Sequence, residues 1–286
     1  MDCSIIIVTW NVRELVDACI RSLRDGAGAL SYEIIVVDNA SSDGTAEHVR
    51  KTFPNVMVLA QKHNLGFAAA NNRGCEHARG RFFVFLNPDT EVRKGALERL
   101  VRFMDADQKV AIAAPKIENP DGSFQQGSIR RDPSLPALLL ILLKVQRLFQ
   151  GGRALSSYYY RDFDPGKTQD VPQAMGACLC VRADVMRSLR YFDERFFLWF
   201  EEVDLCRRVR AAQYRVVFVS DAVVMHHGAQ SFRQQLPLRK QLEYNRSAFR
   251  YFYKYHGAGA ALLLACTMPF NLLISVCYQA VKKYAH

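Results

Sequence analysis

The sequence predicts an α/β fold built on a twisted, mostly parallel sheet that is flanked by helices. Short β-branched or aromatic runs recur over the first part of the chain, and amphipathic or small-residue stretches separate them. Strands buried between two helical layers read as continuous apolar runs, and their alternation with helices is typical of βαβ units. The expected strands are Ser4–Thr9, Glu33–Asp38, Val56–Ala60, Arg81–Leu86 and Val110–Ala114.

Helices are expected between these strands. An amphipathic stretch continues to Leu23, and the polar run Ser41–Thr45 supplies N-cap chemistry for a helix that continues to Val49. The small residues of 66–79 indicate a third helix that packs closely on the sheet. After Pro120 the alternation breaks, so we expect a loop at 150–172 and a second compact block at 173–232.

The composition limits the choice of partner and compartment. Lys+Arg number 38 and Asp+Glu 28, a net charge of +10 that is compatible with nucleic acid, anionic lipid or a phosphorylated substrate. The basic residues are scattered rather than clustered, so nucleic acid is not expected as a partner. Eight cysteines show no disulfide framework, so we expect reduced thiols. An expected strand begins at Ser4 with no signal-peptide pattern before it, so we expect the catalytic part to be cytosolic.

Polar side chains follow three of the expected strands at the point where each strand ends. They are Thr9 with Asn11, Asp38, and Asn87 with Asp89. In open α/β sheets, ligands bind beyond the carboxyl ends of the strands. The coincidence therefore predicts a ligand site at this edge of the sheet.

The run Asn87-Pro88-Asp89 has two interpretations. Asp89 would be a suitable ligand for Mg²⁺ or Mn²⁺, which prefer oxygen and often bridge a substrate diphosphate. The same three residues also make a good turn. His226, the first residue of His226-His227-Gly228, follows another buried run and could join Asp89 if the two loops converge.

Three carboxylates follow an aromatic run in the segment Phe197–Arg208. At helical spacing Glu201, Asp204 and Arg208 share one face, and Glu202 points elsewhere. A carboxylate beside aromatic walls has a raised pKa and can serve as a general base, which favours Glu202. For Asp204 we accept the simpler interpretation, an ion pair with Arg208 one helical turn away.

The segment Asn64–Gly74 places a flexible turn before a small-residue helix. The start of that helix could approach a phosphate, and Asn71 could reach a base or ribose. Close packing of the helix on the sheet explains the alanines of this segment, but it explains Asn71 and Asn72 poorly.

In this order, the segments resemble the family 2 inverting glycosyltransferases of GT-A fold, and within them the bacterial rhamnosyltransferase-like enzymes of O-antigen and other cell-surface glycans. Each segment alone is weak, whereas the ordered set is specific. The segments are Ser4–Asn11, Val36–Thr45, Asn64–Gly74, Phe85–Val92, Phe192–Arg195, Phe197–Arg208 and Val224–Ser231.

The resemblance implies which residues bind the donor. Thr9, Asn11 and Asp38 would hold the nucleoside of a nucleotide-diphosphate sugar. Asn64 and Asn71 lie where the family also contacts the donor.

The resemblance also implies a metal site and a base. Asp89 would bind Mg²⁺ or Mn²⁺ through the DXD-type motif, whose first position is here Asn87, and His226 would be a second ligand. Glu202 occupies the place of the family's catalytic base, where Asp is usual, and Glu201 is its competitor.

The implied reaction is a single displacement with inversion. Glu202 takes the proton of an acceptor hydroxyl, which attacks the anomeric carbon opposite the leaving diphosphate. The subgroup suggests rhamnose as the sugar, and a lipid-linked or saccharide acceptor in bacterial cell-surface polysaccharide synthesis. Two alternatives stay open, a nucleotidyltransferase and a non-catalytic nucleotide-sugar-binding protein.

The C-terminal part predicts contact with membrane lipids. We expect a catalytic domain over 1–256, with an interfacial helix at 135–149 between basic flanks, and a hydrophobic membrane-associated helix within 257–286. The length of the apolar stretch is sufficient for a span, whereas Pro269 and Asn271 near its middle stand against one, so a span and a packed hairpin both stay open. The expected location is the cytoplasmic face of the inner membrane, peripheral or single-span.

Overall fold

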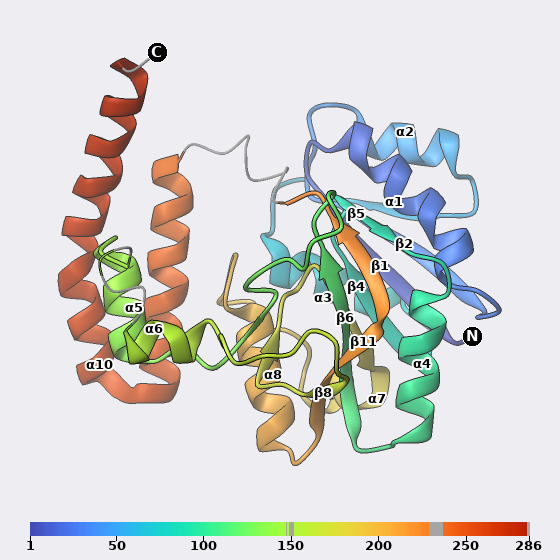
Figure 1. The fold of residues 1–286 in the computed structure, drawn as a ribbon. Coiled ribbons are helices and arrows are strands. Elements are labelled where there is room, and N and C mark those ends of the chain that lie inside the picture. Colours follow the sequence, from blue (N-terminus) through green and yellow to red (C-terminus); the bar gives the residue numbers. More distant parts are fainter. Residues whose placement is uncertain (147, 149–151, 229–236, 285–286) are drawn as a thin grey trace.

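The computed structural model describes residues 1–146, 148, 152–228 and 237–284, and it has one large sheet with helices on both faces (Figure 1). Within these residues, nine strands form this sheet in the order β3-β2-β1-β4-β10-β6-β11-β5, and β8 pairs with β11. Its strands are β1 (Cys3–Thr9), β2 (Tyr32–Asp38), β3 (Met57–Ala60), β4 (Phe82–Leu86), β5 (Thr90–Val92), β6 (Val110–Glu118), β8 (Gln169–Asp170), β10 (Cys178–Arg182) and β11 (Arg215–His226).

A second, two-stranded sheet joins β7 (Ile129–Arg130) to β9 (Gln173–Ala174). The helices cover both faces of the large sheet and extend beyond it at the C-terminus. They are α1 (Arg13–Gly26), α2 (Thr45–Thr52), α3 (Phe67–His77), α4 (Ala96–Ala106), α5 (Leu135–Leu142), α6 (Arg153–Tyr158), α7 (Ala183–Ser188), α8 (Glu201–Ala211) and α10 (Pro237–Tyr284).

The apolar strands bury side chains on both faces, as their composition predicts. In β1, Ile5 and Ile7 join the core under α1 and α4, while Ile6 points to the opposite core under α3 and α8. Successive side chains of a strand face opposite sides, so one continuous apolar run serves two cores. The predicted α/β fold, with its five strands, is confirmed.

The compact block expected at 173–232 contributes two strands to the large sheet. Its strand β10 lies between β4 and β6 and runs antiparallel to both, and its strand β11 pairs in parallel with β6. The expected loop at 150–172 is wrong in part, because it contains α6 and β8. These short elements form because neighbouring parts of the fold supply their partners, which local sequence does not reveal.

The helix expected at 135–149 is shorter than predicted. It ends at Leu142, where Lys144 adopts a left-handed conformation (φ 57°), and residues 147 and 149 lie outside the described part of the chain. Its buried residues Leu138 and Leu142 pack against α10.

The long helix α10 is a hairpin of two arms. The chain turns at Gly257, which has a non-helical conformation (φ 82°, ψ 174°), and the arms lie side by side at the end of the molecule away from α1 and α4 (Figure 1). Asn271 in the second arm is buried and donates through Nδ2 to the carbonyl of Leu142. By length and composition alone, Leu238–Val276 is the one helical stretch among the described residues that could cross a membrane, and the turn at Gly257 divides it.

Candidate active site

The ends of β1 and β2 bring three predicted donor-site residues together. Parallel pairing sets Thr9 opposite Asp38, and Thr9 Oγ1 donates to Asp38 Oδ1 over 3.0 Å. Asp38 also accepts from the backbone N–H of Ser41 and from its hydroxyl, at 3.0 and 2.5 Å. Asn11 accepts through Oδ1 from the N–H of Ser42, and its own N–H donates to Ser41 Oγ. The serines that sequence analysis assigned to helix capping therefore organise this loop.

Asn64 and Asn71 have local partners. Asn64 Oδ1 accepts from the N–H of Gly66, and Asn71, which is buried, donates through Nδ2 to the carbonyl of Phe67. Asn72 connects α3 to another segment, because its amide donates to the carbonyl of Phe192 and accepts from the same residue's N–H. These contacts explain the burial of the Asn72 side chain, and for Asn71 they provide one hydrogen-bond partner of its amide.

Asp89 and His226 lie side by side. The antiparallel pairing of β5 with β11 sets His226 opposite Thr90, the residue after Asp89. Both side chains are buried, and His226 Nε2 lies 3.3 Å from Asp89 Oδ1 without a hydrogen bond between these atoms. The other ring nitrogen, Nδ1, lies 2.8 Å from Oε1 of Gln125.

This arrangement is compatible with a divalent cation. An N–H on Nδ1 that donates to Gln125 leaves a lone pair on Nε2, directed to the same side as the Asp89 carboxylate, and such support is usual for a metal-bound histidine. No group of three or more His, Cys, Asp or Glu side chains that could hold a metal occurs among the described residues. Oxygens of a bound diphosphate would have to complete the coordination, as they commonly do for Mg²⁺.

The neighbours of this pair have other partners. His227 points to Glu91, with 2.9 Å between Nε2 and Oε1. Asn87 is held by its backbone, since its N–H donates to the carbonyl of Ala177 and its carbonyl accepts from Thr90 Oγ1. The last three residues of the segment Val224–Ser231 lie outside the described part of the chain.

A strained aromatic loop leads into the first turn of α8. Trp199 and Phe200 have positive φ of 62° and 69°, a conformation that costs non-glycine residues free energy and is enriched at functional sites. The loop is held from the other side, because the carbonyl of Phe197 accepts from the N–H of Phe67 at 2.7 Å. This contact fixes the position at which Glu201 and Glu202 begin the helix.

The two glutamates have different surroundings. Burial raises the pKa of Glu201 well above its usual range, and the charge of Glu202 raises it further. Burial also raises the pKa of Glu202, but the positive charge of Arg130 acts in the opposite direction. The two carboxyl groups titrate as a coupled pair, and the upward shift of the pKa is larger for Glu201 than for Glu202.

Asp204 forms the predicted ion pair with Arg208, whose Nε lies 2.7 Å from Oδ2. The side chain is fully buried, and Oδ1 accepts from Lys254 Nζ and from the hydroxyl of Tyr255, both at 2.6 Å. Asp204 therefore also ties α8 to the first arm of the α10 hairpin.

Sequence analysis missed the polar residues that face Glu202. A hollow of about 30 Å³ beside Glu202 is lined by Ser128 and Arg130, among others. In the sequence, Arg130 lies just before the apolar stretch at 135–149 and indicates only a basic flank of it. Its position opposite Glu202 depends on the pairing of β7 with β9, two strands of two residues each that carry no detectable pattern.

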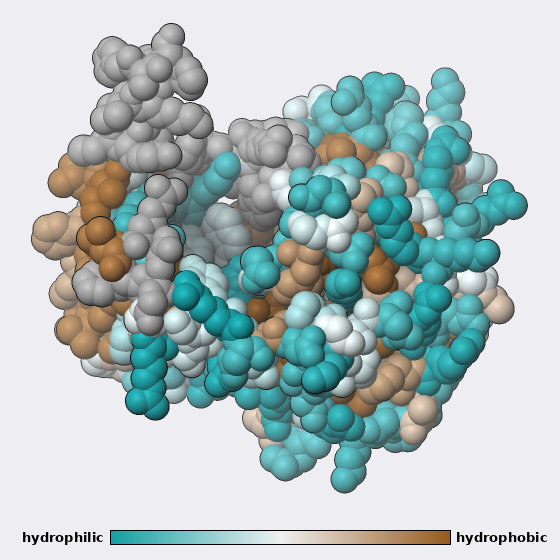
Figure 2. All heavy atoms as spheres, viewed as in Figure 1, coloured by the Kyte–Doolittle hydropathy of each residue, from teal (hydrophilic) through white to brown (hydrophobic). Residues whose placement is uncertain are grey.

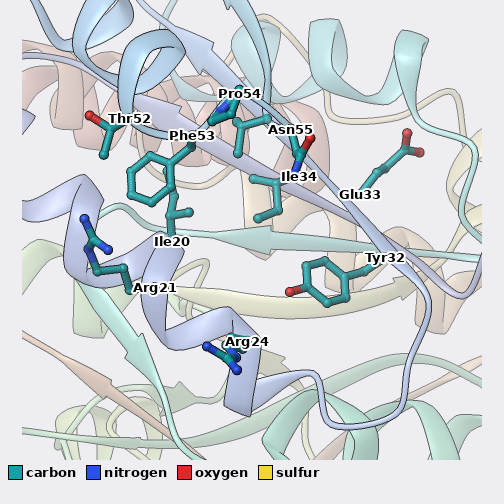
Figure 3. A pocket seen from close by; sticks show the side chains of 11 residues that line it. Ile20, Arg21, Arg24, Tyr32, Glu33, Ile34, Thr52, Phe53, Pro54 and Asn55 are labelled. Carbon is teal, nitrogen blue, oxygen red and sulfur yellow. The ribbon is translucent and has the colours of Figure 1, made fainter.

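A larger hollow of about 690 Å³ lies elsewhere and holds none of the predicted site residues. Figure 3 shows Arg21, Arg24 and Tyr32 around it, on α1 and β2. Two of its charged groups have partners, since Arg21 lies over the Phe53 ring and Glu33 accepts from Arg79.

Comparison with known proteins agrees with the geometry. The model of glycosyl transferase family 2 matches residues 4–186. The chain belongs to glycosyl transferase family 2. This glycosyltransferase is 29% identical over 209 residues to the N-acetylglucosaminyl-diphospho-decaprenol L-rhamnosyltransferase of Mycobacterium tuberculosis, which covers 69% of the chain and 67% of the relative. It is 25% identical over 223 residues to the low-salt glycan biosynthesis hexosyltransferase Agl10 of Haloferax volcanii, covering 73% of the chain and 62% of that relative.

Solved structures share the fold of this glycosyltransferase at low identity. The mannosyltransferase PcManGT from Pyrobaculum calidifontis, in complex with GDP-Man and Mn²⁺, has a TM-score of 0.58 and 17% identity over 99% of this chain and 75% of that one. TarS of S. aureus has a TM-score of 0.57 and 17% identity over 88% of this chain and 44% of that one. The glycosyltransferase thus spans less than half of that TarS chain. The predicted GT-A-type fold is confirmed.

Proposed function

We propose that this glycosyltransferase moves a sugar, with rhamnose the first candidate, from a nucleotide-diphosphate donor to a lipid-linked acceptor with inversion at the anomeric carbon, and that it requires Mg²⁺ or Mn²⁺. The observation that carries the proposal is the Asp89–His226 pair at the carboxyl edge of the sheet, with His226 Nε2 lacking a hydrogen bond. The mycobacterial relative, a rhamnosyltransferase named for a diphospho-decaprenol substrate, supports the choice of sugar and acceptor.

In this proposal the residues of the chain divide the work between donor and acceptor. Thr9, Asn11 and Asp38 form the loop that receives the nucleoside. Asp89 and His226 would hold the metal ion, which when bound neutralises charge on the leaving diphosphate. Glu202 takes the proton of the attacking hydroxyl, and burial together with the charge of Glu202 raises the pKa of Glu201, which makes Glu201 the weaker candidate for the base.

We also propose that the enzyme binds the cytoplasmic membrane face peripherally, through the α10 hairpin. The first arm carries charged residues at helical intervals, Lys240, Glu243, Arg246 and Arg250, which are costly to bury in hydrocarbon. The second arm exposes Leu262, Leu263, Phe270 and Leu273. One apolar face beside a charged arm is suited to lying in the interface rather than to crossing it. Seven cysteines are described as free thiols, consistent with a reducing compartment.

The test is release of nucleoside diphosphate from a panel of nucleotide sugars, with Mg²⁺ or Mn²⁺ and a polyprenyl-diphosphate-linked sugar as acceptor. We expect turnover of one donor, abolished by EDTA and lowered by at least about 100-fold in Asp89→Ala. The matched control is Glu91→Ala. Glu91 lies in β5, two residues after Asp89, and its carboxylate points to His227 instead.

Loss of activity in Asp89→Ala with activity retained in Glu91→Ala supports the proposal. Wild-type turnover that persists in EDTA, together with unchanged activity of Asp89→Ala, contradicts metal dependence. Donor binding without turnover across the whole panel favours a non-catalytic nucleotide-sugar-binding protein. Release of pyrophosphate from nucleoside triphosphates favours a nucleotidyltransferase.

A further inference from the structure

The small hollow beside Glu202 has the size of a single polar group. Its volume of about 30 Å³ is close to the share of liquid volume of one water molecule. Ser128, Arg130 and Gln173 contribute to its wall together with Glu202, so side chains of β7, β9 and α8 meet there. A hydroxyl group is of the right size to occupy it.

Two buried oxygens at this hollow lack partners. Ser128 is 2% exposed and its Oγ makes no hydrogen bond, and Oε2 of Glu202 makes none either. Burying such atoms without a partner costs about 1–3 kcal/mol each, so native folds rarely leave two side by side. A carboxylate oxygen accepts only, whereas a serine hydroxyl can donate. Their complement is a group that donates to Glu202 and accepts from Ser128, as an alcohol does.

Arg130 supplies a positive charge at the same place. Its Nε donates to the carbonyl of Gly127 at 2.7 Å, and Nη1 donates to the hydroxyl of Tyr158 at 3.3 Å. In the described part of the chain Arg130 makes no ion pair with a carboxylate within 4 Å, so Glu202 across the hollow is the anion with which its charge interacts.

We propose that this hollow is the subsite for the acceptor hydroxyl, in which Ser128 and Glu202 hold the attacking alcohol and Arg130 lies across from the Glu202 carboxylate. The inference rests on the proposed function, because it requires Glu202 to be the base. In the reaction the hydroxyl proton passes to Glu202 Oε2 and the oxygen forms a bond to the anomeric carbon. The bond from that carbon to the diphosphate oxygen breaks, and its electron pair leaves with the nucleoside diphosphate. Ser128 and Arg130 are positioning residues in this scheme.

Arg130 is the cation that acts on Glu202 among the groups facing it. On α8 itself these are Glu201 and Cys206, and burial raises the pKa of both. From α10 the group is Tyr244, whose pKa burial also raises. Burial raises the pKa of Glu202, and backbone hydrogen bonds, the charge of Arg130 and a hydrogen bond with Glu201 act in the opposite direction.

The experiment compares Arg130→Gln, Arg130→Lys and Ser128→Ala in the full chain, with transfer to the acceptor measured against pH at saturating donor. The base must be ionised, so kcat/KM rises with pH through the pKa of Glu202. We expect Arg130→Gln to shift the rise of kcat/KM to a pH about one unit higher. We expect Arg130→Lys to keep most of the wild-type pH profile, because it keeps the positive charge. We expect Ser128→Ala to raise the acceptor KM about 5- to 10-fold while donor binding is kept.

The matched control is Arg131→Gln. Arg131 is the next residue, is partly exposed and pairs with Asp162 at 2.8 Å, so its loss should leave the pH profile in place. If Arg130→Gln fails to fold, the pH profile of Arg130→Lys and the acceptor KM of Ser128→Ala are the measurements that test the proposal. An unshifted Arg130 profile together with an unchanged acceptor KM in Ser128→Ala overturns the subsite and leaves Glu202 as base. Absence of any transfer by wild type overturns the proposed function, and the subsite with it.

Discussion

Glu201 and Glu202 are neighbours in one helical turn, yet only Glu202 borders the polar hollow. Glu201 is 5% exposed, and its Oε2 makes no hydrogen bond. Two carboxylates of the same kind therefore differ in their surroundings, because Glu202 interacts with the charge of Arg130, whereas burial and the charge of Glu202 both raise the pKa of Glu201.

This difference predicts a pH-dependent gain in stability for Glu201→Gln. The pKa of Glu201 is raised in the folded state, so its stabilising contribution is fully present below the unfolded pKa and is lost as pH rises through the folded pKa. Glutamine keeps the neutral shape at every pH. We expect the variant to raise the thermal midpoint more at about pH 8 than at about pH 5.

The measurement is thermal unfolding of both proteins at the two pH values. Glu14→Gln is the control, because Glu14 is exposed and its replacement removes no buried group. A drop in the midpoint of Glu201→Gln at the higher pH would contradict the prediction and indicate that Glu201 is ionised in the fold.

At the scale of elements, the site depends on the contact between the turn before α3 and the aromatic loop before α8. Gly66 has φ of +84°, and a Cβ added there would lie 2.4 Å from the carbonyl oxygen of Phe197. Only glycine allows the two backbones to approach this closely. The position of the first turn of α8, and of Glu202 in it, follows from this approach.

We expect Gly66→Ala to lower the free energy of unfolding by at least about 3 kcal/mol, since it adds a backbone clash to the cost of positive φ. Gly44→Ala is the matched control: Gly44 also has positive φ, of +79°, but an added Cβ meets nothing within 4 Å. Its cost should be about 1 kcal/mol. Chemical denaturation of the two variants is the measurement, and equal losses would show that the contact with Phe197 adds nothing.

At the scale of the whole molecule, apolar surface gathers at one end. Figure 2 shows hydrophobic residues over the α10 hairpin, in contrast to the mostly hydrophilic surface over the sheet and its helices. The exposed fractions are 64% for Leu262, 62% for Phe270 and 62% for Leu273. Contiguous exposed apolar surface of this kind marks an interaction site. Asp204, bonded to Lys254 and Tyr255, connects that end to the helix of Glu202.

We expect the double variant Leu263→Ser, Phe270→Ser to bind anionic vesicles about 10- to 100-fold more weakly than wild type, because two side chains no longer enter the apolar layer. Co-sedimentation with vesicles measures this. Met57→Ser is the control. Met57 is also an exposed apolar residue, but it lies on β3, an edge strand of the large sheet, and not on the hairpin. Equal binding by wild type and the double variant would contradict docking through the second arm.

The sequence by itself determined the five strands that alternate with helices, the polar residues at their carboxyl ends and the family. Buried parallel strands and helix faces have strong local periodicity, and the family segments are each continuous. It also predicted the pairing of Asp204 with Arg208, because both lie on one helix. The roles assigned to Thr9, Asn11, Asp38, Asp89, His226 and Glu202 stay predictions.

Only the tertiary structure decided which distant residues meet. The insertion of β10 between β4 and β6, the approach of Gln125 to His226 and the place of Arg130 opposite Glu202 all join segments far apart in the chain. Such contacts arise from strand pairing across the sheet, and strands as short as β7 and β9 have no periodicity that could predict it. The environment that separates Glu201 from Glu202 is likewise a property of packing, since the two residues are chemically identical neighbours.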